Sequence, residues 1–205
     1  MYASDLAQYL RERILKVRIA VLWVLLTAAV SLNNVARPHL LPWIAAACAL
    51  FLMAFRLWDD VADLEHDRQF HSDRHLCRSQ NVAFFRATHW FLVVASGGFI
   101  FLLTDVSRAA GFWLLVVVLW ATYGITSSRP RLRPLRMAVV LTKYPALILL
   151  LAQNLEQSLP WIAAIGIYVL LILDEARSIG SGIVPPFALI AAVVVVFKWA
   201  LNLWK

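Results

Sequence analysis

The sequence has little charge for its length. Only 15% of its 205 residues are charged, whereas 62% are hydrophobic, and the mean hydropathy is +0.74. A soluble domain of this size carries far more charge, so a soluble globular class is excluded. Several apolar runs approach or reach the roughly 20 residues that a helix needs to cross a bilayer. The composition therefore predicts an all-α, polytopic transmembrane helical bundle, and we expect residues 1–205 to form one domain in the lipid bilayer.

Cysteine is also scarce. The two cysteines, Cys48 and Cys77, fall in a predicted span and in a predicted cytoplasmic loop, where a structural disulfide is not expected. A zinc site is not indicated either, because His71 and His75 are four residues apart without an evident third ligand. A cleavable signal peptide is not expected, since a charged amphipathic stretch precedes the first apolar run and no small-residue cleavage site follows cleanly.

The positive charge is gathered beside the apolar runs. The formal net charge is +7, but the basic residues cluster in predicted loops next to spans, which is the pattern that orients a membrane protein. We therefore expect no nucleic-acid partner. Residues 1–18 form a basic amphipathic segment that we expect to lie at the cytoplasmic surface. The seven predicted spans are residues 17–32, 40–58, 81–103, 109–126, 137–152, 159–173 and 187–203.

The loops between these spans predict the orientation. Fourteen Lys and Arg residues fall on the side of the N-terminus and four on the other side. The positive-inside rule then places the N-terminus in the cytoplasm and the C-terminus on the opposite side of the membrane. The same assignment puts the two acidic stretches described next, and a basic loop, on the cytoplasmic face.

Acidic residues concentrate in one stretch. Half of the twelve acids lie within fifteen positions after the second predicted span, namely Asp59, Asp60, Asp63, Glu65, Asp67 and Asp73. On a helix Asp60, Asp63 and Asp67 share one face, and like charges one turn apart repel each other. A cation is expected to offset that repulsion, and Mg²⁺ suits carboxylates combined with substrate phosphates. The alternative is a solvated charged loop after a transmembrane helix.

Other polar residues on the same predicted face complete a candidate site. Asp174 and Glu175 end the sixth span and could bind a second metal, although a helix end at the interface also tolerates charge. Candidate contacts for a diphosphate are Arg74, Tyr123 and Arg131. Basic loops also set topology and meet lipid headgroups. Lys143 lies inside the fifth span, where it either snorkels to the interface or reaches into a cavity.

These residues resemble the UbiA superfamily of intramembrane prenyltransferases. The first motif of that family, N or D followed by D-x-x-D-x-x-x-D at the end of the second span, matches Asp59, Asp60, Asp63 and Asp67 in full spacing. The segment HSDRHL, with Arg74, and the loop after Tyr123 are also similar. The resemblance covers about residues 10–182. Two features depart from the family: only the adjacent pair Asp174 and Glu175 stands for the second motif, and the chain has fewer predicted spans.

The resemblance implies a Mg²⁺-dependent enzyme that ionises a prenyl diphosphate and transfers the prenyl group to a hydrophobic, aromatic or other lipid-soluble acceptor. It implies metal binding by the six carboxylates at 59, 60, 63, 67, 174 and 175, with Asp60, Asp63 and Asp67 as the catalytic set. Diphosphate binding is implied for Arg74, Tyr123, Arg131 and Lys143. The alternatives are a terpene cyclase of the same family, which quenches the cation internally, and a non-catalytic membrane protein that binds a prenyl lipid or another subunit. A cation transporter is less consistent with acids that cluster at one face, and the sequence does not indicate an oligomeric state.

Overall fold

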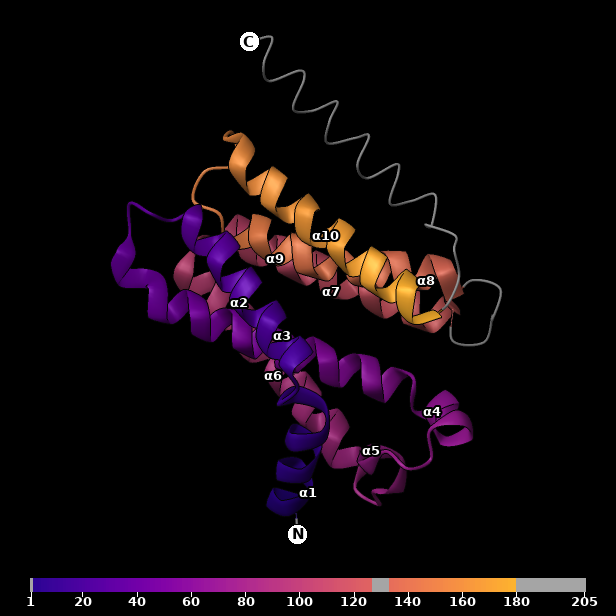
Figure 1. Ribbon diagram of the computed structural model, residues 1–205. Helices are drawn as coiled ribbons and strands as arrows, with labels where there is room; N and C mark the ends of the chain where they lie inside the picture. Colours follow the sequence, from indigo (N-terminus) through magenta and orange to yellow (C-terminus); the bar gives the residue numbers. More distant parts are fainter. Residues whose placement is uncertain (1, 127–132, 180–205) are drawn as a thin grey trace.

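A computed structural model describes residues 2–126 and 133–179, and every regular element within these ranges is helical (Figure 1). The all-helical class predicted from composition is confirmed. The elements in chain order are α1 (Tyr2–Tyr9), the π-helical η1 (Leu10–Ile14), α2 (Val17–Leu32), the 3₁₀ turn η2 (Pro38–Leu40), α3 (Leu41–Ala62), α4 (Leu64–Phe70), α5 (His75–Arg78), α6 (Val82–Leu103), α7 (Val106–Thr126), α8 (Arg133–Leu141), α9 (Lys143–Leu151) and α10 (Ser158–Ile179).

Four helical stretches are long and apolar enough to cross a membrane. They are Pro38–Ala62, Val82–Leu103, Val106–Thr126 and Ser158–Glu175. A fifth is added if Ser4–Ile14 and Val17–Leu32, which are bent by 76° at their junction, count as one span. Large apolar side chains such as Phe91, Leu102 and Leu114 are exposed on these helices, as lipid-facing residues are. The chain is therefore consistent with an integral membrane protein of four or five spans in its described part.

The prediction of seven spans is not confirmed. The fifth predicted span, residues 137–152, is divided at Thr142 between α8 and α9. Pro145 explains the break, because its ring clashes with the carbonyl of residue 141 and it lacks an N–H for the helix. The division makes Lys143 the first residue of α9. The seventh predicted span, residues 187–203, lies outside the described residues.

The main core forms around α3. This helix packs along α6 and α2, while α10 packs along α9 and α7 contacts α6, α8 and α9. Figure 1 shows α2, α3 and α6 on one side of the bundle and α7, α9 and α10 on the other. The aromatic side chains of Phe51, Phe55 and Phe112 are fully buried between them. Their contacts fix the end of α3, which carries the acidic residues.

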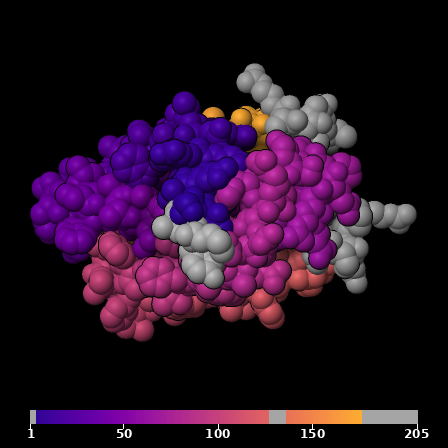
Figure 2. Space-filling view, turned by 90° about the horizontal axis from the view of Figure 1, so that it is seen from below, coloured from indigo at the N-terminus to yellow at the C-terminus, as the bar shows by residue number. Residues whose placement is uncertain are grey.

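The N-terminal residues form a second, smaller core. We call residues 4–14 the N-terminal strap; it hangs below the bundle in Figure 1 and lies against the magenta region of the chain in Figure 2. Tyr9, which is 1% exposed, packs with Leu57, Leu76 and Phe85 from α3, α5 and α6. Through these apolar side chains the strap packs against the end of the bundle, and its expected place at the cytoplasmic surface stays a prediction.

Polar contacts at the far end of the bundle hold α9. The Arg108 guanidinium donates to the Leu149 carbonyl at 2.5 Å and to that of Leu150 at 3.2 Å, and Asn34 Nδ2 donates to the Leu151 carbonyl at 3.0 Å. The last carbonyls of a helix lack partners within it, so these donors act as a C-terminal cap. With α9 held there, Lys143 at its first residue has a defined position at the opposite end.

Candidate functional site

Four aspartates follow one another along α3 and α4, and we refer to Asp59, Asp60, Asp63 and Asp67 as the acidic cluster. Asp63 separates the two helices, yet its amide donates to the Asp59 carbonyl at 2.9 Å and the Asp67 amide donates to the Asp63 carbonyl at 2.8 Å. Helical spacing therefore continues through the junction. Residues three, four and seven apart lie on one face, so Asp60, Asp63 and Asp67 share a face and Asp59 lies one turn before Asp63.

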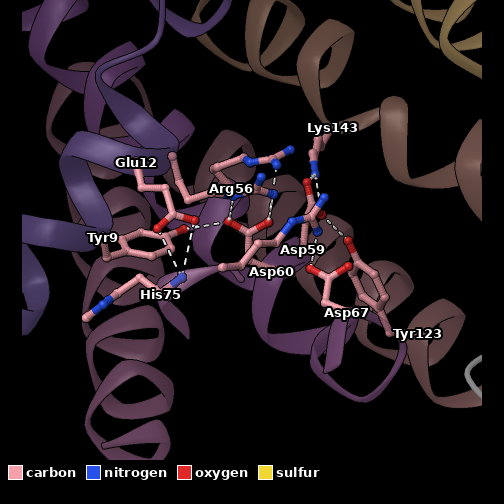
Figure 3. A network of polar contacts seen from close by, with 11 residues as sticks. Tyr9, Glu12, Arg56, Asp59, Asp60, Asp67, His75, Tyr123 and Lys143 are labelled. Carbon is pink, nitrogen blue, oxygen red and sulfur yellow. Dashed lines mark hydrogen bonds and ion pairs between the residues drawn. The ribbon is translucent and has the colours of Figure 1, made fainter. Parts of the chain in front are cut away.

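Asp59 is bound by residues of α7 and α9. Lys143 Nζ contacts both of its carboxylate oxygens, at 2.7 and 2.6 Å, and the Tyr123 hydroxyl donates to Oδ1 (Figure 3). Lys143 is only 1% exposed. Of the two positions considered for it, snorkelling or reaching inward, the structure has the second. An ionised lysine that is buried requires such a partner, because an unpaired charge in an apolar interior is very costly.

Asp60 is bound by the N-terminal strap. Arg13 donates to both carboxylate oxygens, from Nη2 to Oδ1 at 2.5 Å and from Nε to Oδ2 at 2.9 Å. The Tyr9 hydroxyl donates to Oδ2 at 2.9 Å, and Arg56 lies 3.2 Å from Oδ1. Figure 3 shows Asp60 between Tyr9 and Arg56, with Asp59 turned towards Lys143. The two adjacent carboxylates therefore face different parts of the molecule.

Asp63 and Asp67 have simpler surroundings. Arg136 of α8 contacts Asp63 Oδ1 at 2.6 Å, and Arg74 forms an ion pair with Asp67 Oδ2. Burial raises the pKa of the Asp63 carboxyl above its usual value, although the neighbouring Arg136 lowers it. The charges of Asp59 and Asp67 add to that increase in the pKa. The electrostatic cost of ionising Asp63 is therefore only partly offset by protein cations, and it favours a further positive charge nearby.

The second acidic pair has a different environment. Arg18 forms an ion pair with Asp174 and lies 3.6 Å from Glu175, and all three side chains are exposed, by 60%, 50% and 39% respectively. The structure thus joins the end of α10 to the start of α2. Arg131, predicted to bind a diphosphate, lies outside the described residues.

The structure joins Arg74, Tyr123 and Lys143 to the acidic cluster, and it adds four residues that the sequence analysis did not select. These are Tyr9, Arg13, Arg56 and Arg136. Helical spacing offered a signal for some of them, since Tyr9 and Arg13 are four residues apart, as are Arg56 and Asp60. No comparable signal pointed to Arg136, which was counted only among the basic residues of a loop.

The carboxylates of the acidic cluster differ in how much room they leave for Mg²⁺. Within residues 2–126 and 133–179, no three His, Cys, Asp or Glu side chains form a group that could hold a metal ion. A carboxylate offers about four lone-pair sites, and Asp60 already contacts four donor atoms. Asp63 and Asp67 each contact one cation. Because Mg²⁺ is commonly held by one or two carboxylates plus phosphates, Asp63 and Asp67 fit that role.

The chain was compared with known proteins, and no family model, curated protein or solved structure matches it. The similarity of its aspartate spacing to the UbiA superfamily therefore remains a prediction from the sequence.

Proposed function

We propose that the protein is a Mg²⁺-dependent intramembrane prenyltransferase that ionises a prenyl diphosphate and transfers the prenyl group to a lipid-soluble, aromatic acceptor. One observation carries the proposal: four aspartates of α3 and α4 meet basic side chains from the strap, α8, α9 and the residue before α5 at one end of an apolar bundle. Ionisable groups buried within a bundle of membrane helices are costly and usually functional, and Asp60, Asp67 and Lys143 are buried. Carboxylates and cations gathered in one place match a metal-bound diphosphate, which needs both.

The basic residues would bind the phosphate oxygens. In this structure Arg74, Arg136 and Lys143 each pair with an aspartate. We propose that a diphosphate replaces the carboxylate on these cations, since guanidinium groups form strong paired hydrogen bonds with phosphate. Asp63 and Asp67 would hold Mg²⁺, which would neutralise the charge that develops on the leaving diphosphate. Metal binding at Asp174 and Glu175 stays a prediction.

Aromatic rings beside Asp59 would surround the reacting end of the prenyl chain. Trp58 lies 5.6 Å from the ring of Tyr123, 5.6 Å from Phe55 and 4.8 Å from His89, measured between ring centroids. These side chains are buried. The π face of an aromatic ring attracts a cation, so this group suits an allylic cation formed when the C–O bond breaks. The electron pair of that bond leaves with the diphosphate, and the acceptor supplies the pair for the new bond.

Two alternatives share parts of this site. A terpene cyclase would use the same ionisation and quench the cation within its own chain, which the aromatic group around Trp58 would also serve. A non-catalytic prenyl-lipid-binding protein is favoured by a different observation, namely that each aspartate of the acidic cluster is paired with a protein cation. Such pairs need no metal for charge balance.

The test is diphosphate release from prenyl diphosphates of several chain lengths, measured on the full chain in lipid with Mg²⁺ and with EDTA. We expect release that requires the metal. Analysis of the organic products then separates transfer to an added aromatic acceptor from cyclisation without one. Well-folded protein that releases no diphosphate from any chain length would refute both enzymatic proposals and leave the binding protein.

A further inference from the structure

We propose that Asp60 is the anchor of the N-terminal strap and not a metal ligand, so that the two adjacent aspartates of the acidic cluster have separate roles. The anchor role follows from contacts within the protein and is independent of the proposed function. The statement about metal binding rests on that function.

Saturation of the Asp60 carboxylate is the first argument. Oδ1 contacts Arg13 Nη2 and Arg56, and Oδ2 accepts from Tyr9 and from Arg13 Nε. With about four lone-pair sites on a carboxylate, these four donor atoms leave no position for a cation. Asp60 is also 5% exposed. A metal could reach it only if the paired guanidinium of Arg13 left, which would leave a partly buried charge without its partner.

The strap has further attachments that agree with an anchoring role. Glu12 accepts from the His75 amide at 3.0 Å, at the start of α5, and Asn81 Nδ2 donates to Asp5 at 2.5 Å. The apolar side chain of Tyr9 packs against Phe85 with ring centroids 5.5 Å apart. These contacts lie along the whole strap, and the Arg13–Asp60 ion pair adds a charged contact in which the Asp60 side chain is only 7% exposed. Losing this pair should therefore weaken the attachment of the strap to α3.

Asp63 provides the contrast. It lies three residues after Asp60, and among the described residues it contacts one cation, Arg136; its side chain is 33% exposed. Both positions belong to the same aspartate motif, and both change to asparagine with nearly the same shape. Asp60→Asn and Asp63→Asn are therefore a matched pair, in which one variant should affect the strap and the other should affect the metal.

The experiment uses the full chain in lipid nanodiscs and two readouts. The first is hydrogen–deuterium exchange of the amides of residues 4–14. The second is binding of Mn²⁺ together with inorganic pyrophosphate, followed by electron paramagnetic resonance. For Asp60→Asn we expect strap exchange to accelerate about tenfold or more, because hydrogen bonds to a charged group are lost. Mn²⁺–pyrophosphate binding should stay within about threefold of wild type, as the ligands remain.

For Asp63→Asn we expect the reverse, with strap exchange unchanged and Mn²⁺–pyrophosphate binding lost. A second substitution, Arg13→Gln in the Asp60→Asn background, should recover part of the strap protection, because it removes a guanidinium left without its carboxylate. Asp60→Asn that abolishes Mn²⁺–pyrophosphate binding and leaves strap exchange unchanged would overturn the proposal.

A milder variant keeps the test decisive if Asp60→Asn does not fold. Tyr9→Phe removes one donor to Asp60 and retains the ring in the second core. We expect faster strap exchange with unchanged Mn²⁺–pyrophosphate binding, and unchanged exchange would contradict the anchor role. If the wild type itself binds no Mn²⁺ with pyrophosphate, the proposed function fails, while the exchange measurement still decides whether Asp60 anchors the strap.

Discussion

The two acidic sites of this chain look alike in sequence and differ in the folded protein. Each follows an apolar run and each includes a pair of adjacent acids, Asp59–Asp60 and Asp174–Glu175. In the structure the first pair is enclosed by side chains from the strap, α7 and α9, whereas the second pair meets Arg18 at an exposed position. The first pair therefore differs from a charged helix end in two ways: its carboxylates are less exposed, and side chains from several helices contact them.

Solvent explains why the difference matters. An exposed ion pair contributes about 0–1 kcal/mol, because water screens its charges and ordering two long side chains costs entropy. Removing one partner of a buried pair costs about 3–5 kcal/mol, because the other charge is left uncompensated. The acidic cluster and the Arg18–Asp174 pair should therefore respond very differently to equivalent substitutions.

The largest effect is expected for Lys143→Met, which leaves Asp59 without its buried cation. We expect a loss of about 3–5 kcal/mol in the free energy of unfolding, measured on detergent-solubilised protein. Adding Asp59→Leu to the same chain should restore most of that loss, since neither charge then remains unpaired. A loss below about 1 kcal/mol for the single variant would show that Asp59 is as well solvated as an exposed acid.

Tyr123→Phe should have a smaller effect on the same carboxylate. The substitution removes the hydroxyl that donates to Asp59 and keeps the aromatic ring beside Trp58. We expect a loss of about 2 kcal/mol in unfolding free energy, the usual range for a hydrogen bond to a charged group. Tyr168→Phe is the control, because that hydroxyl donates to the uncharged Ala138 carbonyl at 2.9 Å. An equal loss in both variants would refute a special role for the charge.

Asp63 should make stability depend on pH in a defined direction. Burial raises its pKa in the folded protein above the ordinary value of 3.8. The folded state thus holds the proton more tightly than the unfolded state, so the contribution of Asp63 is fully present below pH 3.8 and is lost as the pH rises through the raised value. Wild type should lose stability relative to Asp63→Asn across that window. Wild type that instead gains stability relative to Asp63→Asn as the pH rises would show that the pKa is lowered.

The smallest effect is expected for the exposed pair. Arg18→Gln should change the unfolding free energy by less than about 1 kcal/mol, because both side chains are in contact with solvent. Added salt should reduce even that change, since it screens exposed charges. The measurement is the same unfolding experiment at low and high ionic strength. A salt-independent loss comparable to that of Lys143→Met would place Arg18 in a buried network and remove the contrast between the sites.

The sequence was a good guide to local features of this fold. Apolar runs predicted the helices that carry most of the candidate spans, and the spacing of the aspartates predicted one helix face shared by Asp60, Asp63 and Asp67. Lys143 was singled out as an unusual position within an apolar segment, and it is buried against Asp59. These features depend on residues close together in the chain, where helical periodicity applies directly.

The partners of the aspartates were harder to predict. Asp60 is bound by Arg13, 47 residues away, and Asp59 by Lys143, 84 residues away. Such pairs depend on how whole helices pack against one another, and the spacing of residues within one helix does not predict that packing. The break at Thr142 had a local signal in Pro145, but its consequence, a lysine turned to the cluster, also depended on the position of α9.

The most direct test of the proposed site is Mg²⁺-dependent diphosphate release from a prenyl diphosphate by Asp63→Ala and by Asp174→Ala, measured beside wild type in the same lipid. We predict that Asp63→Ala abolishes release and that Asp174→Ala lowers it by a smaller factor, because Asp174 lies in the exposed pair with Arg18. Loss of release in Asp174→Ala together with normal release in Asp63→Ala would contradict the assignment of the acidic cluster as the diphosphate site.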